Sequence, residues 1–244
     1  MKIVQVGAIA TGTVIIFGIF LVVPVFFPPS SKLPVLLTFD IVDNNNLPDW
    51  CTQLSSVLKK HDISAVVFVT GKIAQQYPQC VSGFSNKVDV GSQTYDYSQL
   101  TSISDYSQQL EEIKNGKIAV DTAGNLDSKL FRAPYGATDA NIYSLLERSS
   151  ILADFSYKNQ YNKYYNGQFI KFDLISYDSA VITTTFIEGL SQDKGPVSIY
   201  YDNSTPVDKI DNFISKLDQG KTKFVNASYL TGLDLTVRKG GWFS

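Results

Sequence analysis

The stretch from Leu58 to Gly71, LKKHDISAVVFVTG, decides the fold. Residues 63–69 form a short run of apolar and small residues, which is typical of a buried strand, and Thr70-Gly71 ends it. The preceding segment, 49–60, carries apolar residues at helical spacing. A helix that leads directly into a buried strand is the repeating unit of a parallel α/β fold.

The same alternation continues along the chain in both directions. The pattern predicts strands at 33–39, 63–69, 88–91, 130–132, 151–155, 169–173, 197–201 and 223–226, and helices at 49–60, 73–77, 106–115, 141–148 and 207–217. Gly116 is expected to end the third helix, and Asn159–Gly167 is expected to be an exposed aromatic loop. Seven or eight such units favour a barrel of parallel strands, although periodicity alone also fits an open sheet.

The N-terminus predicts a membrane anchor. No charged residue occurs from Ile3 to Phe27, whereas a helix needs about 20 apolar residues to cross the hydrocarbon core. A cleaved signal peptide is the alternative, but its apolar core is usually about 7–15 residues. We therefore expect a transmembrane anchor at 1–28, a hinge at 29–33 and one domain at 34–244. The positive-inside rule favours a domain on the extracytoplasmic side of the cell membrane.

Composition narrows the partners. The 244 residues carry a net charge of −2, without the basic stripe that nucleic-acid binding requires. Cys51 and Cys80 are the two cysteines, and they either form a disulfide or remain reduced in the core. Asn203 and Asn226 begin glycosylation sequons. Gly7, Thr11 and Gly18 share one face of the expected anchor, where small residues allow packing against another transmembrane helix.

Three short motifs stand at or just after the ends of predicted strands. They are Thr38-Phe39-Asp40, Gly91-Ser92-Gln93-Thr94-Tyr95-Asp96-Tyr97 and Phe131-Arg132-Ala133-Pro134-Tyr135-Gly136. Together with residues 58–71 they resemble the NodB-type polysaccharide deacetylases, a family of carbohydrate esterases. The resemblance covers about Leu33 to Ala227 and implies an α/β fold with a distorted, incomplete (β/α) barrel, preceded here by the transmembrane helix.

The resemblance also implies roles for individual residues. Asp40 matches the general base, and Arg132 matches the arginine that pairs with it. Tyr135 matches the tyrosine that lines the site, and Tyr201 falls where the family has its general-acid histidine. The family's D-x-x-D-W element is expected between Asp154 and Gln160. Substrate contacts are expected from Gln93, Tyr97, Pro134 and Gly136.

The metal ligands of the family are missing. Its second aspartate and two histidines hold a divalent metal, and these positions are Ile41, Gln93 and Tyr97 here. Isoleucine has no lone pair, glutamine is a poor ligand and tyrosine ordinarily ionises near pH 10. His61 is the one histidine of the chain and falls at a predicted helix end, away from the motifs. We therefore expect no metal site and no cofactor.

Two classes of function remain open. One is a membrane-anchored, extracytoplasmic pseudoenzyme that serves as a glycan-binding module or as an accessory subunit of a membrane complex. Its partners would be a cell-surface glycan or a transmembrane protein, with no nucleic acid. The other is an active carbohydrate deacetylase or hydrolase that uses Asp40 and Arg132 without the usual metal.

Overall fold

The structure is a computed structural model that describes residues 32–42, 46–181, 186, 195–217 and 220–239. Its strands are β1 (Leu33–Ile41), β2 (Ala65–Val69), β3 (Val88–Ser92), β4 (Leu126–Ser128), β5 (Leu130–Phe131), β6 (Ala153–Asp154), β7 (Gln160–Tyr165), β8 (Gln168–Asp173), β9 (Ile175–Asp178), β10 (Val197–Asp202), β11 (Thr222–Val225) and β12 (Thr236–Arg238). Its helices are α1 (Leu47–Lys60), α2 (Gly71–Gln76), α3 (Gln79–Ser82), α4 (Tyr106–Gly124), α5 (Ala140–Arg148), α7 (Val207–Lys216) and α8 (Ala227–Thr231).

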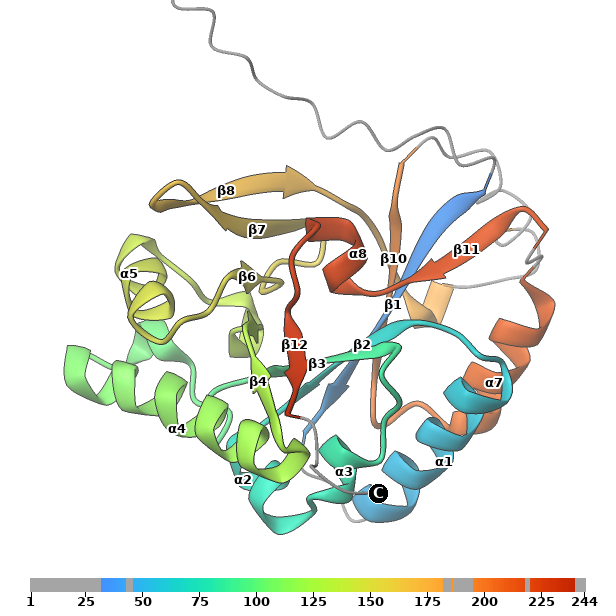
Figure 1. Cartoon of the computed structure of the whole chain (residues 1–244), viewed down its shortest axis with the longest axis horizontal. Helices are drawn as coiled ribbons and strands as arrows, with labels where there is room; N and C mark the ends of the chain where they lie inside the picture. The colour runs from blue at the N-terminus through green and yellow to red at the C-terminus, as the bar shows by residue number, and fades with distance from the viewer. Residues whose placement is uncertain (1–31, 43–45, 182–185, 187–194, 218–219, 240–244) are drawn as a thin grey trace, which may run out of the picture. The chain divides into compact units, whose positions relative to one another are not determined.

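Strands β4 and β12 pair with each other, antiparallel, in a separate two-stranded sheet. The other ten described strands form one curved sheet with α1 and α7 on its outer side (Figure 1). Its order is β8-β7-β6-β5-β3-β2-β1-β10-β9, and β11 also pairs with β1. All pairs from β5 through β3, β2, β1 and β10 to β9 are parallel, as the sequence predicted. In the described part of the chain the end strands β8 and β9 do not pair with each other, so the barrel is incomplete.

Strand β1 is the centre of the sheet. Val35 pairs with both Val197 of β10 and Phe224 of β11, whereas β2 begins its pairing at Thr38. Since a strand has two edges, β10 takes one edge of β1, and β11 and β2 share the other. Successive side chains alternate between faces, so the odd-numbered residues of β1 join the core beneath α1 and α7. Leu36 faces the second core, inside the barrel.

Two predictions about single elements were wrong. Helix α4 continues past Gly116 to Gly124. The glycine at 116 does not end the helix; it lies against the Thr94 carbonyl, which a Cβ atom would overlap. The expected loop at 159–167 is instead the hairpin β7–β8, with its turn at Asn166 and Gly167, both of which have positive φ. Asn-Gly is the preferred pair for a two-residue hairpin turn, and this signal identifies the hairpin.

The two cysteines form a disulfide that joins α1 to α3. Cys51 and Cys80 are bonded through their sulfur atoms, their Cα atoms lie 5.1 Å apart, and both side chains are fully buried. This decides the question that the sequence left open in favour of the bridge. A cross-link that closes a loop of this size stabilises a protein by about 2–4 kcal/mol.

The two predicted glycosylation sites are part of the folded structure. Asn203 is 4% exposed, and its side-chain oxygen accepts a hydrogen bond from the Val42 amide. The side chain of Asn226 caps α8 by accepting from the Tyr229 amide and donates to Lys87. The Asn203 prediction is wrong for the folded protein, because a glycan has no room there, and the Asn226 side chain has a structural role.

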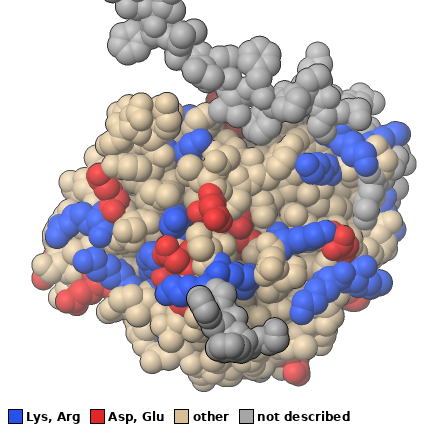
Figure 2. All heavy atoms as spheres, viewed as in Figure 1, with Lys and Arg blue, Asp and Glu red and all other residues tan. Residues whose placement is uncertain are grey.

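The predicted anchor at 1–28 and most of the hinge lie outside the described residues, while Leu33 already begins β1. Across the described ranges, no helix has the length and hydropathy to span a bilayer. On the face shown in Figure 2, lysine and arginine side chains are interspersed with aspartate and glutamate. That face has no field of a single sign, in keeping with the net charge of −2.

Candidate functional site

A pocket of about 460 Å³ opens where several parallel strands end. The carboxyl ends of such strands are the usual place for a site in folds of this type. Asp40 comes from β1, Tyr200 from β10 and Arg132 from the residue after β5. The pocket is lined by Asp40, Tyr97, Arg132, Ala133, Tyr135, Gly136, Ser156, Tyr157, Lys158 and Tyr200.

The Asp40 carboxylate is held at both oxygens. Arg132 donates from Nη1 to Oδ1 over 2.7 Å, and the Tyr200 hydroxyl donates to Oδ2 over 2.9 Å. The side chains of Asp40 and Arg132 are 6% and 9% exposed. The ion pair that the sequence predicted is therefore present and largely withdrawn from water.

Arg132 is fixed by more than Asp40. Its Nε donates to the Phe155 carbonyl over 2.9 Å, and its guanidinium carbon lies 4.1 Å from the centre of the Phe68 ring. Phe68 can lie there because position 91 is glycine: a Cβ atom would come 2.7 Å from the Phe68 ring. The arginine thus has a defined position on an aromatic surface, where cation–π attraction adds to the ion pair.

Tyr200, and not Tyr201, belongs to the site. Tyr201 is 3% exposed, and its ring stacks on Phe39 with the ring centres 5.4 Å apart. Both rings belong to the core beneath α1 and α7, which we call the outer core. The prediction for Tyr201 was wrong because a shift of one residue along a strand moves a side chain to the opposite face. Burial, and then the charge of Asp40, raise the pKa of Tyr200 well above its ordinary value, so its hydroxyl stays a proton donor.

The Pro134-Tyr135-Gly136 turn supplies one wall of the pocket. Tyr135 has φ +59° and is 72% exposed, and its ring lies 5.3 Å from the ring of Tyr97. Gly136 has φ +69°, a backbone conformation that favours glycine. Pro134 is buried and does not line the pocket, so it is not placed to contact a ligand there as predicted.

Tyr97 and Gln93 are the residues that the sequence resemblance matched to the family's two metal-binding histidines. Tyr97 lines the pocket with φ +70°, and burial, followed by the charge of Asp40, raises its pKa to about 12. Gln93 is fully buried outside the pocket lining, and neither atom of its amide has a hydrogen-bond partner among the described residues. Tyr97 is therefore placed to contact a ligand in the pocket, whereas Gln93 is not.

These residues do not fit the family's metal. Ile41 lies in the outer core, on the opposite face of β1 from Asp40, and has no donor atom. A neutral phenol with a raised pKa and a buried carboxamide do not form the donor set of a catalytic zinc site. Within the described ranges, no three His, Cys, Asp or Glu side chains cluster closely enough to hold a metal ion.

The segment after β6 contributes three site residues that the sequence did not predict. Ser156, Tyr157 and Lys158 line the pocket, and Lys158 Nζ lies 4.1 Å from the centre of the Tyr200 ring. They fall inside Asp154–Gln160, where the family's D-x-x-D-W element was expected. None of the three residues matches an aspartate of that element. Only the expected location of the element pointed to this segment in the sequence.

His61 has the structural place that the sequence indicated. It is the C-cap of α1, and its Nε2 lies 2.5 Å from Asp211 Oδ1 of α7. The residue lines no part of the Asp40 pocket. Nucleophilic catalysis that depends on a histidine therefore has no support in this site.

The incomplete barrel and the Asp40–Arg132 pair at its mouth are those expected of a deacetylase-type protein. Comparison with known proteins identifies the family. The profile of the polysaccharide deacetylase family matches residues 28–151, and the chain belongs to this family. Solved structures show the same fold at low identity. Peptidoglycan deacetylase PdaC from Bacillus subtilis is 20% identical, with a TM-score of 0.61 over 82% of this chain and 90% of that one.

A second solved structure is a CE4 family pseudoenzyme from Bacillus anthracis. It is 14% identical, with a TM-score of 0.62 over 82% of this chain and 66% of that one. At such identities the likeness shows the fold alone. The chain thus has the fold of the family 4 carbohydrate esterases.

Curated relatives are peptidoglycan-N-acetylglucosamine deacetylases. The one from Bacillus cereus is 31% identical over 112 residues, which are 46% of this chain and 39% of the relative. PgdA from Listeria monocytogenes is 24% identical over 231 residues, which cover 88% of this chain and 44% of PgdA. The chain spans about two fifths of the length of these relatives.

Proposed function

We propose that this protein is a deacetylase-like pseudoenzyme that binds a glycan in the Asp40 pocket and does not deacetylate it. The observation that carries the proposal is the state of the Asp40 carboxylate. Both of its oxygens accept hydrogen bonds from protein side chains, Arg132 and Tyr200. Each oxygen keeps a further lone pair, but the carboxylate is 6% exposed, and the described residues around it include no cluster that could hold the metal-bound water on which the family's base acts.

The catalytic partners of a base are also lacking. The three family positions for metal ligands hold Ile41, Gln93 and Tyr97, which do not form a metal-binding set. Tyr200 has a raised pKa and already donates its proton to Asp40, so it is a poor general acid at neutral pH. Neither side of an acid–base mechanism is therefore ready to act.

The pocket retains features that suit a sugar. Its volume is within the usual range for ligand sites, and the side chains of Tyr97, Tyr135, Tyr157 and Tyr200 line it. Tyrosine presents a flat apolar ring for the C–H face of a sugar and a hydroxyl for its polar edge. The names of the curated relatives direct the choice of ligand to glycans that contain N-acetylglucosamine.

Binding and catalysis can be separated in one experiment. The full chain in mild detergent is titrated with N-acetylglucosamine tetramer and with peptidoglycan fragments, and acetate release is measured in parallel. We expect saturable binding without acetate. Tyr135→Ala should weaken binding at least tenfold, whereas Tyr165→Ala, which removes a similarly exposed tyrosine outside the pocket, should not. Absence of binding to every glycan would contradict the proposal.

The second candidate is an active carbohydrate esterase that uses Asp40 and Arg132 without the usual metal. It is favoured by the retained pair and by the family. This candidate predicts acetate release that Asp40→Asn abolishes and that chelators leave unchanged. Release that chelators abolish would instead indicate a metal enzyme and contradict both candidates.

We further propose that residues 1–28 anchor the domain in the cell membrane, on its extracytoplasmic side, where a glycan or a transmembrane partner is within reach. The uncharged run from Ile3 to Phe27 supports this. Gly7→Leu together with Gly18→Leu should weaken association with a transmembrane partner and leave insertion intact. A mature N-terminus near Pro28, found by terminal sequencing, would contradict a retained anchor.

A further inference from the structure

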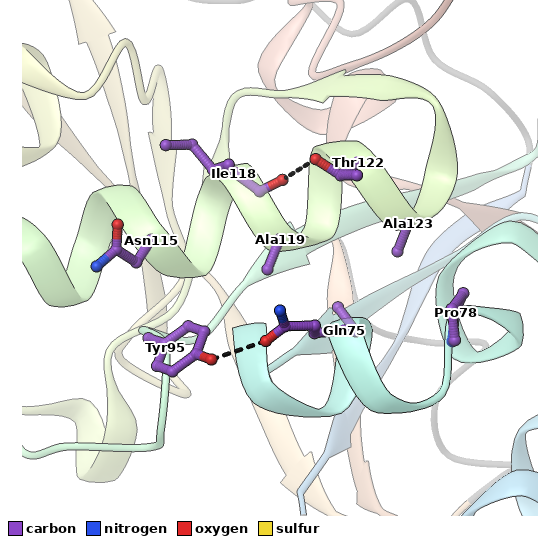
Figure 3. A pocket seen from close by; sticks show the side chains of 9 residues that line it. Gln75, Pro78, Tyr95, Asn115, Ile118, Ala119, Thr122 and Ala123 are labelled. Atoms are coloured by element: carbon purple, nitrogen blue, oxygen red, sulfur yellow. Dashed lines mark hydrogen bonds between the residues drawn. The ribbon is translucent and has the colours of Figure 1, made fainter.

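A second hollow of about 670 Å³ lies between α2 and α4, and it shares no lining residue with the Asp40 pocket. Figure 3 shows its two walls: Gln75 on α2 with Pro78 just beyond it, and Ile118, Ala119, Thr122 and Ala123 on α4. We call this hollow the α2–α4 groove. Ile118, on the α4 wall, is 60% exposed.

The chemistry of the groove favours an apolar occupant. Three of its four polar side chains already make hydrogen bonds: the Tyr95 hydroxyl donates to Gln75 Oε1 over 2.8 Å, and Thr122 Oγ1 donates to the Ile118 carbonyl over 2.7 Å (Figure 3). The fourth, Asn115, is exposed. The remaining surface comes largely from alanine, proline and isoleucine side chains. Such a surface gains by excluding water and offers a sugar little hydrogen bonding.

The described chain ends beside this groove. The Lys239 amide donates to the Asn125 carbonyl over 2.9 Å, and Asn125 Nδ2 donates to the Lys239 carbonyl over 3.1 Å. Asn125 is the left-handed C-cap of α4, directly after the turn that contributes Thr122 and Ala123. Two hydrogen bonds therefore hold the end of β12 to the end of the helix that forms one wall.

The next residues are Gly240-Gly241-Trp242-Phe243-Ser244, which lie outside the described residues. Trp242 is three residues beyond Lys239, a reach of about 10 Å in an extended chain. Ala119 precedes Asn125 by six residues, which is about 9 Å along a helix axis. The two glycines permit a sharp turn, and the two aromatic rings after them match the apolar surface within reach.

We propose that Trp242 and Phe243 of the same chain dock into the α2–α4 groove. The anchoring of Lys239, the distance to Ala119 and the apolar chemistry of both surfaces carry the proposal. The docked segment covers Ile118 and fastens the C-terminal end of the domain to α4. The inference is independent of the glycan role, because it involves no residue of the Asp40 pocket.

Fluorine NMR of the full chain in mild detergent tests the docking. The protein has two tryptophans, Trp50 and Trp242, so 5-fluorotryptophan labelling gives two signals, and Trp242→Phe assigns them. We expect the Trp242 signal to show a small H2O-to-D2O shift. Ala119→Glu, which places a charge in the groove, should increase that shift to the value of free tryptophan. Ser144→Glu, at an exposed position of α5, should leave it unchanged.

A second measurement covers the case in which Ala119→Glu does not fold. Deletion of residues 240–244 should move the methyl signals of Ile118 and Ala123 and leave those of Ile199 and Val225 in place. Unchanged groove methyls would overturn the proposal, as would a Trp242 signal that is fully solvent-exposed in the unmodified chain. Protection that disappears on dilution would assign the groove to the tail of a second copy and also overturn it.

Discussion

Arg132 Nη1 lies 2.7 Å from Asp40 Oδ1, and less than a tenth of either side chain is exposed. The arginine also bonds the Phe155 carbonyl and lies over Phe68, so its position does not depend on the carboxylate alone. Water screens the attraction between two charges little in this setting, and each charge offsets part of the other's desolvation cost. The pair is consequently a structural element of the pocket, whatever its part in chemistry.

Removal of the arginine should therefore destabilise the fold. Arg132→Ala leaves the Asp40 carboxylate buried without its cation, and we expect the free energy of unfolding to fall by about 3–5 kcal/mol. Urea denaturation followed by circular dichroism measures it. Arg148→Ala, at the exposed end of α5, is the control and should change stability little. Equal losses in the two variants would show that the pair contributes nothing specific.

The two adjacent tyrosines of β10 should respond differently to loss of a hydroxyl. Tyr200→Phe removes the donor to Asp40 Oδ2, and we expect a loss of about 1–3 kcal/mol because a buried acceptor is left unpaired. The Tyr201 hydroxyl is buried without a partner in the described structure, so Tyr201→Phe should be neutral or stabilising. Urea unfolding of the two variants measures the difference, and the opposite ranking would restore Tyr201 to the site.

Asp154 should make stability depend on pH. Its carboxylate is fully buried, and burial raises its pKa despite hydrogen bonds from Ser156, Tyr143 and Asn162. In the unfolded chain an aspartate ionises near pH 3.9, so above that pH the folded state binds more protons than the unfolded state. The free energy of unfolding contributed by this group is highest below about pH 3.9 and falls as pH rises to the folded pKa.

The comparison with Asp154→Asn isolates this effect, because asparagine does not titrate. The stability of the unmodified protein, minus that of the variant, should decrease from pH 4 upward until the folded pKa is passed. Urea unfolding at half-unit pH steps measures it. A difference that stays constant with pH would show that Asp154 is not the titrating group.

Metal binding should be recoverable by substitution. Gln93→His with Tyr97→His supplies two imidazoles, and Ile41→Asp adds the family's carboxylate. We expect the triple variant to bind zinc more tightly than the double variant, and both more tightly than the unmodified chain, as measured by calorimetry and chelator competition. Since Ile41 faces the outer core, the carboxylate also requires the end of β1 to turn. Stoichiometric zinc in the unmodified chain would contradict our interpretation of the site.

Much of the barrel could be predicted because its strands are buried on both faces. Residues 33–39 and 63–69 are apolar runs in the sequence. Strand β1 extends the first run to Ile41, and β2 (Ala65–Val69) lies within the second. Arg132 could be predicted for a different reason: residues 131–136 resemble the motif in which the polysaccharide deacetylases carry the arginine that pairs with their base. In both cases local sequence and tertiary packing favour the same outcome.

The errors arose where a long-range contact decides the outcome. Gly116 resembles a helix end, but it is a contact point with the Thr94 carbonyl, and no local pattern shows that. The choice between Tyr200 and Tyr201 depends on the register of β10 against β1, in which Tyr200 pairs with Thr38. Register cannot be derived from two identical neighbouring side chains. The Asn166-Gly167 turn, by contrast, was present in the sequence as a local signal.

The disulfide between α1 and α3 has a consequence for kinetics. Both sulfur atoms belong to fully buried residues, so a thiol reagent in solution meets the bond after α1 or α3 has moved away from the core. The rate of reduction then measures how often this side of the barrel opens and not how reactive the bond is. At low reagent concentration that rate gives the opening equilibrium, and at high concentration it approaches the opening rate itself. The kinetics of disulfide reduction thus report on local unfolding of this side of the barrel.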